Sequence, residues 1–176
     1  MTLLRRLRRD RRGVSAVEFA LIAPIMIAFY FGLCEFCQAF MAQQRMGHAA
    51  ATVADLVTQA DVISTGEIRD IFTVGGLIMA PFPVDDLRQR VTSVSMDDRG
   101  RVRVDWSRGD GLSPRGQGSS MTLPAGLIEA GQSVIVTEVE YDFDSPMDFV
   151  LPQVTQFSNT YYLRPRRVES ITLVNN

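Results

Sequence analysis

The N-terminal part of the chain contains an apolar run that changes into an amphipathic pattern. Residues 19–34 carry no charge, and the largely apolar stretch continues to Met41 with one charged residue, Glu35. A helix of about 20 apolar residues is long enough to cross a bilayer. The pattern therefore predicts a transmembrane helix over 14–41. Beyond it apolar positions recur at spacings of three and four, which predicts that the helix continues through 42–62.

The remainder, 63–176, is predicted to fold as one small head. Ser64 or Thr65 is typical of a helix start, with Glu67 in the first turn, and the helix must end before Pro81. The residues expected on its buried side are Ile68, Ile71, Phe72, Gly75, Ile78 and Met79. After Pro81 the apolar period becomes two, which indicates strands. The predicted strands cover 90–96, 101–106, 132–144, 156–163 and 170–174, with a flexible, exposed, Gly- and Ser-rich loop at 107–120. The fold class is therefore α+β: a long N-terminal helix that continues as a stalk, a second helix and a small antiparallel sheet.

Alternation within two strands predicts which side chains share a face. In the strand 101–106 we expect Val102, Val104 and Trp106 on one face, and Arg101, Arg103 and Asp105 on the other. In the strand 132–144 we expect Val139, Tyr141 and Phe143 on one face, opposite an acidic stripe of Glu138, Glu140, Asp142 and Asp144. Arginines across the sheet, such as Arg101 and Arg103, are expected to neutralise this stripe.

The acidic stripe together with Asp148 could instead bind Ca²⁺. A calcium ion takes six to eight oxygen ligands that surround it, whereas alternate residues of one strand lie in a row. A salt-bridged face is therefore favoured, and no metal is expected.

Charge is distributed unevenly along the chain. Six arginines precede residue 13, and short basic flanks stay in the cytoplasm, so the N-terminus is expected in the cytoplasm and the head outside the membrane. Past residue 13 there are 12 Arg and 19 acidic residues, a balance of −7. This acidic balance argues against nucleic acid as a partner, since nucleic acid selects basic surfaces. The apolar run is also longer than the 7 to 15 residues of an ordinary signal peptide, so removal by signal peptidase is not expected.

Residues for catalysis or metal binding are scarce. Cys34 and Cys37 lie inside the apolar stretch, where we interpret them as packing residues in preference to a redox pair. The sole histidine, His48, has no nucleophile elbow or zinc-ligand spacing around it. The tripeptide Arg108-Gly109-Asp110 is too short to indicate adhesion by itself. We therefore expect no enzyme activity and no cofactor.

A processing motif precedes the apolar run. The segment Arg11-Arg12-Gly13-Val14-Ser15-Ala16-Val17-Glu18-Phe19 resembles the type IV prepilin signal in the form used by Tad pili, a glycine followed by four residues, Glu and an aromatic residue. The resemblance implies that 1–13 is a basic leader. In that family a prepilin peptidase cuts on the cytoplasmic face, which would be after Gly13, and Val14 would become the new N-terminus.

Glu18 and Phe19 are the expected assembly residues. A carboxylate at the start of a membrane helix is costly without a partner, and the freed amine of Val14, on the same chain or a neighbour, can supply one. A second interpretation is an acid tolerated by the positive end of the helix. The choice between them stays open here.

The resemblance extends further into the helix. The segments 17–24 and 31–36 are similar to the opening of the TadE-like family of Tad pilus assembly proteins, including Pro24, Gly32 and Glu35. Cys37 departs from the small residue, commonly glycine, that is usual there. Pro24 removes one helical hydrogen bond. Glu35 is either a residue at the membrane boundary or the donor or acceptor of a hydrogen bond between helices.

The resemblance implies a minor pilin or pseudopilin with a pilin-like head in the bacterial inner membrane, the head being periplasmic. Its expected partners are the prepilin peptidase, other pilin or pseudopilin subunits, the inner-membrane pilus assembly machinery and membrane lipid. Incorporation into the pilus itself stays open. The alternative is an uncleaved single-pass anchor, similar to TadG-like proteins, whose head binds a partner.

Overall fold

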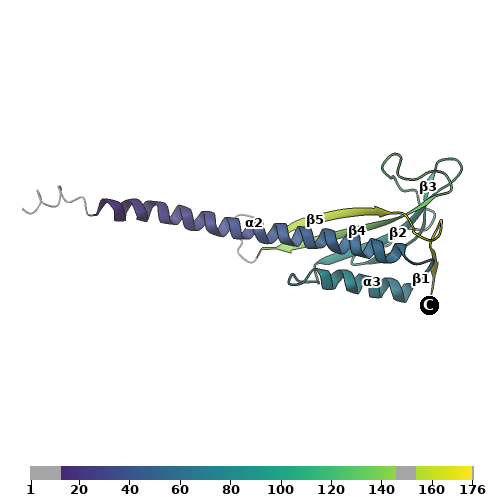
Figure 1. The fold of residues 1–176 in the computed structure, drawn as a ribbon, viewed down its shortest axis with the longest axis horizontal. Helices are drawn as coiled ribbons and strands as arrows, with labels where there is room; N and C mark the ends of the chain where they lie inside the picture. The colour runs from purple at the N-terminus through teal and green to yellow at the C-terminus, as the bar shows by residue number, and fades with distance from the viewer. Residues whose placement is uncertain (1–12, 146–153, 176) are drawn as a thin grey trace, which may run out of the picture.

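A computed structural model describes residues 13–145 and 154–175. Its longest element is α2, Val14–Thr58, one helix of 45 residues that passes through Pro24 without ending. Figure 1 shows the N-terminal half of α2 projecting beyond the rest of the fold, while its C-terminal half lies against it. The predicted continuation of the apolar helix as a stalk is confirmed.

The second helix, α3, spans Thr65–Ile78. Ser64 caps it: the Ser64 hydroxyl accepts a hydrogen bond from the Glu67 backbone N–H at 3.2 Å, and the Glu67 carboxylate accepts one from the Ser64 N–H at 2.7 Å. The hydrogen bond from the Ser64 backbone N–H to the carboxylate lowers the pKa of Glu67, because it favours the charged form. Ile68, Phe72 and Gly75 are buried, so the predicted start and buried side of this helix are confirmed.

The sheet has four strands, each antiparallel to its neighbour, in the order β3-β2-β4-β5. Their bounds are β2 Leu87–Met96, β3 Val102–Asp110, β4 Ser133–Asp144 and β5 Val154–Leu163. A separate parallel pair joins β1, Val62–Ser64, to β6, Thr172–Val174. The predicted α+β class is therefore confirmed, although the C-terminal strand pairs with β1 and not with the main sheet.

Both helices pack on one face of the sheet (Figure 1). Small side chains of α2 allow a close approach to β4, where Val139, Tyr141 and Phe143 form the predicted apolar face. This cluster comprises Ala39, Ala42, Met46, Ala50, Met79, Leu87, Val139, Tyr141 and Phe143. A second cluster, farther along α2, comprises Val53, Val57, Ile63, Ile68, Phe72, Val91, Trp106, Ile135 and Ile171. The two clusters fix the head to the C-terminal half of α2.

The prediction that Val102, Val104 and Trp106 share one face of β3 is wrong. The register between β2 and β3 shifts at Ser93/Val94, so that Val94 pairs with Val104 but Ser93 pairs with Trp106. The extra residue, Asp105, reverses the alternation: Val104 and Trp106 face opposite sides of the sheet. Trp106 packs in the cluster beneath the helices, where its indole N–H donates to the Ile171 carbonyl at 2.7 Å.

The acidic stripe is neutralised, but by other arginines than expected. Glu138 binds Arg90 at 2.7 Å and Arg115 at 2.6 Å, and Asp142 binds Arg88 at 2.8 Å. β2 runs beside β4 and supplies Arg88 and Arg90 in register, whereas β3 is one strand removed. Glu140 also lies 3.5 Å from Arg88, so the prediction of a salt-bridged face is confirmed for Glu138, Glu140 and Asp142. Asp148 lies outside the described residues.

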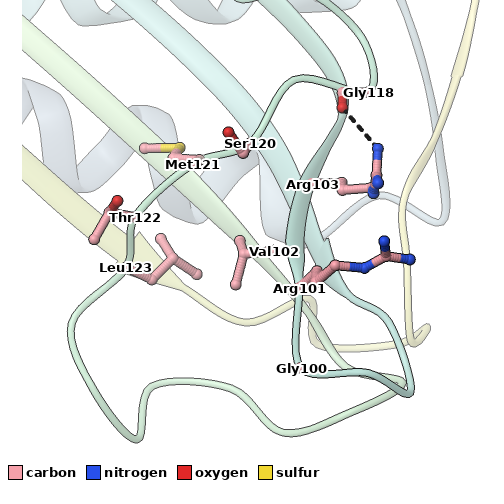
Figure 2. Close-up of a pocket in the computed structure, with 9 residues that line it drawn as sticks. All are labelled: Gly100, Arg101, Val102, Arg103, Gly118, Ser120, Met121, Thr122 and Leu123. Atoms are coloured by element: carbon pink, nitrogen blue, oxygen red, sulfur yellow. Dashed lines mark hydrogen bonds between the residues drawn. The ribbon is translucent and has the colours of Figure 1, made fainter.

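The two arginines predicted for that role lie at the start of β3, which β2 separates from the acidic stripe on β4. Figure 2 shows Arg101 and Arg103 pointing to one side of β3, away from Val102. Arg101 pairs with Asp97 at 2.8 Å, and Arg103 donates to the Gly118 carbonyl at 3.2 Å. The assignment of Arg101 and Arg103 to the acidic stripe was wrong, because β3 does not adjoin β4.

Candidate processing and assembly site

The candidate processing site lies at the open start of α2. Gly13 is the residue before the helix, with φ −88° and ψ −13°, and its carbonyl accepts the Val17 N–H at 3.1 Å. Apart from Gly13 itself and the adjacent backbone, no described atom lies within 4 Å of the position that a Cβ on Gly13 would occupy. Val14 is 49% exposed. The bond between Gly13 and Val14 is thus uncovered by the described part of the fold.

Glu18 lies one helical turn beyond Val14, on the same side of α2, because residues four apart are neighbours on a helix. It is exposed, and it forms no hydrogen bond or ion pair with another described residue. The first turn of α2 holds no acidic residue. Since the effect of a helix N-terminus fades within the first turn, that effect does little for a carboxylate at this position.

Phe19 is 72% exposed, and the apolar side chains that follow it are exposed around the whole helix. The large exposed side chains in this part of α2 are Leu21, Ile22, Ile25, Met26, Ile27, Phe29, Tyr30, Phe31 and Leu33. A helix that is apolar on all sides needs lipid or protein around it. Within the described residues, α2 is the one helix whose length and composition suffice to cross a membrane, with its apolar window near the N-terminus.

Pro24 lies within this exposed part of α2. Because proline has no N–H, the carbonyl of Ala20 loses its helical donor. In lipid such a carbonyl is tolerated where a neighbouring group compensates. Pro24 therefore locally weakens a helix that otherwise runs unbroken for 45 residues.

Glu35 lies where the head begins to cover α2. Its side chain is fully buried, and Ser145, the residue after β4, donates a hydrogen bond from its hydroxyl to the Glu35 carboxylate at 2.5 Å. Gly32, half-buried, precedes it by one turn on the same side of the helix. A partner of Glu35 thus lies in its own head, which neither interpretation of the sequence included. The two residues are 110 positions apart, and no sequence pattern linked them.

The remaining sequence candidates do not form a site. Cys34 is half-buried and Cys37 is exposed on α2, and both are free thiols. Across residues 13–145 and 154–175, no three His, Cys, Asp or Glu side chains are grouped so that they could hold a metal ion. Gly109 lies in β3 with the Leu112 carbonyl over it, and Arg108 donates to Asn175 at 2.8 Å. The tripeptide 108–110 is therefore part of the sheet and does not form a projecting loop.

A hollow of about 640 Å³ lies beside β3 (Figure 2). Figure 1 shows β3 at the end of the head far from the start of α2. It is lined by Gly100, Arg101, Val102, Arg103, Gly118, Ser120, Met121, Thr122 and Leu123. The hollow is open, and its two arginines already hold Asp97 and the Gly118 carbonyl. Nothing in it resembles a set of reacting groups.

Comparison with known proteins identifies the part of the chain that carries the candidate site. Residues 13–55 match the TadE-like protein family. This region contains Gly13, Glu18, Pro24 and Glu35, and it ends shortly before the end of α2. No curated protein and no solved structure is similar enough to the chain to count as a match. The resemblance inferred from the motif is therefore confirmed for α2, which carries a TadE-like domain.

Proposed function

We propose that this chain is a minor pilin or pseudopilin that acts in the assembly of a Tad-type adhesion pilus, after a prepilin peptidase has cut it between Gly13 and Val14. A TadE-like domain indicates a pilin-like protein associated with Tad pili. The proposal adds the cut, the role of Glu18 and the partners: the peptidase, other pilin or pseudopilin subunits and the inner-membrane assembly machinery. It needs no catalytic residue in this chain.

The observation that carries the proposal is the exposed carboxylate of Glu18, which pairs with no other described residue and lies one turn beyond the bond that would be cut. An unpaired carboxylate is costly in a membrane helix, whereas the amine of Val14 exists only after the cut. Cutting would therefore create the cation that Glu18 lacks. An amine on a neighbouring subunit would make this pair a contact between subunits.

The head supports this function because it covers only the C-terminal part of α2. Buried residues of α2 begin at Glu35, so the region before it is available for lipid or for other helices. In the membrane-resident state the chain would be anchored in the bacterial inner membrane with its head in the periplasm. Exchange of lipid for helices of other subunits would then bring it into an assembly without unfolding the head.

The assembly role is tested by replacing the carboxylate. Glu18→Gln keeps the shape of the side chain and removes its charge, while Glu18→Asp keeps the charge. We expect the Gln variant to insert into the membrane and to be cut, but to leave cells without surface pili. The Asp variant is expected to restore part of the pili. Pili are counted by electron microscopy, and insertion is measured by membrane fractionation.

Val17→Ala is the matched control, because Val17 is the adjacent residue, is 61% exposed and carries no charge. It should assemble pili at the wild-type level. Normal pili in the Gln variant would overturn the assembly role of Glu18. The alternative function, an uncleaved anchor with a partner-binding head, predicts that none of these three substitutions changes pilus number.

A further inference from the structure

The uncovered part of α2 has the length of a membrane span. From Val14 to Cys34 no side chain of α2 is buried by the head, and Glu35 is the first that is. These 21 residues rise about 31 Å at 1.5 Å per residue, and the hydrocarbon core of a bilayer is about 30 Å thick. Figure 1 shows this part of α2 projecting from the head without a neighbour among the described elements. The part of α2 that the head leaves uncovered is therefore as long as the hydrocarbon core is thick.

Beyond this point α2 has two different sides. The side with Glu35, Ala39 and Ala42 is buried by the head. The opposite side is still apolar and open: Phe36 is 62% exposed, and Phe40 is 51% exposed. We call Phe36, Phe40 and Met41 the collar stripe; Met41 is 49% exposed.

The collar stripe ends abruptly at Gln43, Gln44 and Arg45, all exposed and polar. It thus occupies the helix only from about residue 36 to residue 41, a rise of roughly 8 Å. The polar headgroup region on one side of a bilayer is about 5 to 8 Å thick, which is the same thickness. An apolar stripe of this height, continuous with the membrane span, fits the interfacial layer.

The orientation of the Glu35 side chain is consistent with a collar stripe in the interfacial layer. It is the sole charged residue between Glu18 and Arg45, and it faces the head, where it accepts the hydrogen bond from Ser145. Its carboxylate is therefore kept away from the lipid side at the level where the stripe begins. A charge on that side would oppose burial of the stripe among acyl chains and headgroups.

We propose that, in the membrane-resident state, the head rests on the bilayer surface and the collar stripe lies in the lipid headgroup layer. The partner of the stripe is thus lipid, and the head cannot swing freely away from the membrane, because the stripe and the head occupy the two sides of the same rigid helix. The inference rests on membrane anchoring by α2 but not on cutting or on the role of Glu18.

The test is depth-dependent quenching of tryptophan emission. The full chain is placed in phosphatidylcholine vesicles whose acyl chains carry bromine either near the headgroup or near the bilayer centre. Phe36→Trp and Phe40→Trp report the stripe. Phe29→Trp reports the middle of the span, and Gln44→Trp is the matched control just above the stripe. The native Trp106 stays in place as a constant background, since it is buried in the head.

We expect shallow bromine to remove most of the added emission of Phe36→Trp and Phe40→Trp, and deep bromine to remove most of that of Phe29→Trp. Gln44→Trp should lose little with either lipid. Emission from both stripe variants that behaves like Gln44→Trp would overturn the proposal, because the head would then stand away from the membrane.

A second copy of the chain is the other possible occupant of the stripe. In that case the stripe tryptophans would be protected from both brominated lipid and aqueous acrylamide at every ratio of protein to lipid, and this result would also overturn the proposal. Failure of anchoring is distinguished separately, since Phe29→Trp would then escape deep bromine as well.

Discussion

The carboxylate of Glu138 is the polar group of the sheet whose removal should weaken the head most. It is held by two arginines, Arg90 at 2.7 Å and Arg115 at 2.6 Å, and the side chains of Glu138 and Arg90 are each 16% exposed. Glu138→Gln keeps the volume of the side chain but removes its charge. Arg90 then loses its counter-ion in a largely buried position, and Arg115 loses its counter-ion in a partly exposed one.

The expected cost lies between two limits. Exposed ion pairs contribute about 0 to 1 kcal/mol, whereas removal of one partner from a fully buried pair costs about 3 to 5 kcal/mol. Arg90 keeps a hydrogen bond to the Ser113 carbonyl at 2.9 Å, and Arg115 is 34% exposed, so the upper limit is not reached. We expect Glu138→Gln to lower the free energy of unfolding by about 2 kcal/mol.

The assay is urea unfolding of the full chain in detergent micelles, followed by the emission of Trp106 in the head core. The matched control is Glu140→Gln on the same strand. Glu140 lies 3.5 Å from Arg88, is 34% exposed, and shares Arg88 with Asp142. Its loss should cost about 0.5 kcal/mol or less.

The variants Glu138→Gln and Glu140→Gln also allow a test by pH. Burial raises the pKa of Glu138, but the hydrogen bonds and charges of Arg90 and Arg115 lower it by more, so the net pKa lies below the ordinary value of 4.5. The stabilisation is therefore complete above pH 4.5 and is lost as the pH falls through the lower pKa of the folded state. Equal costs for Glu138→Gln and Glu140→Gln, or a cost for Glu138→Gln that does not shrink in acid, would refute this reasoning.

Two further predictions concern close packing and ionisation in the head. Gly75→Ala would place a methyl group against the Gln89 side chain and 2.9 Å from a methyl of Val53, so we expect a loss of about 1 to 3 kcal/mol in the same unfolding assay. Gly66→Ala, also in α3, meets nothing closer than 3.9 Å and should be neutral or slightly stabilising; equal losses would show that packing is not the cause. Burial, with Asp86 and Asp144 nearby, raises the pKa of Tyr141 from 10.0 to about 12, so the head should lose stability as the pH rises between these values. Ultraviolet titration should show a late tyrosine that is missing in Tyr141→Phe, and identical curves would contradict the assignment.

The regular elements could be predicted because local periodicity determined them. The apolar spacing predicted α2 nearly to its observed end, and Ser64 with Glu67 identified the start of α3. Alternation in β4 predicted which of its side chains face the helices. In each case the information lies within one segment of the chain.

The misplaced residues depended on pairing between distant segments. Arg101 and Arg103 were assigned to the acidic stripe because nothing in the sequence shows that β2, and not β3, adjoins β4. The bulge at Asp105 moved Trp106 to the other face for the same reason. A one-residue irregularity reverses every later side chain in a strand, and local alternation cannot reveal it.

Only part of the candidate site could be predicted from the sequence. Gly13 and Glu18 were identified from a contiguous motif, and residues 13–55 match the family that the motif indicated. The partner of Glu35 could not be identified, because Ser145 reaches it only through the folding of the whole head. The roles of Gly13, Val14, Glu18 and Phe19 stay predictions.

The central claim is that the chain is processed between Gly13 and Val14, and the mass of the membrane-extracted protein tests it most directly. Cells that contain the prepilin peptidase should yield a chain that begins at Val14, and cells without it a chain that begins at Met1. Gly13→Leu should remain uncut in both. A wild-type chain that begins at Met1 in the presence of the peptidase would contradict the account.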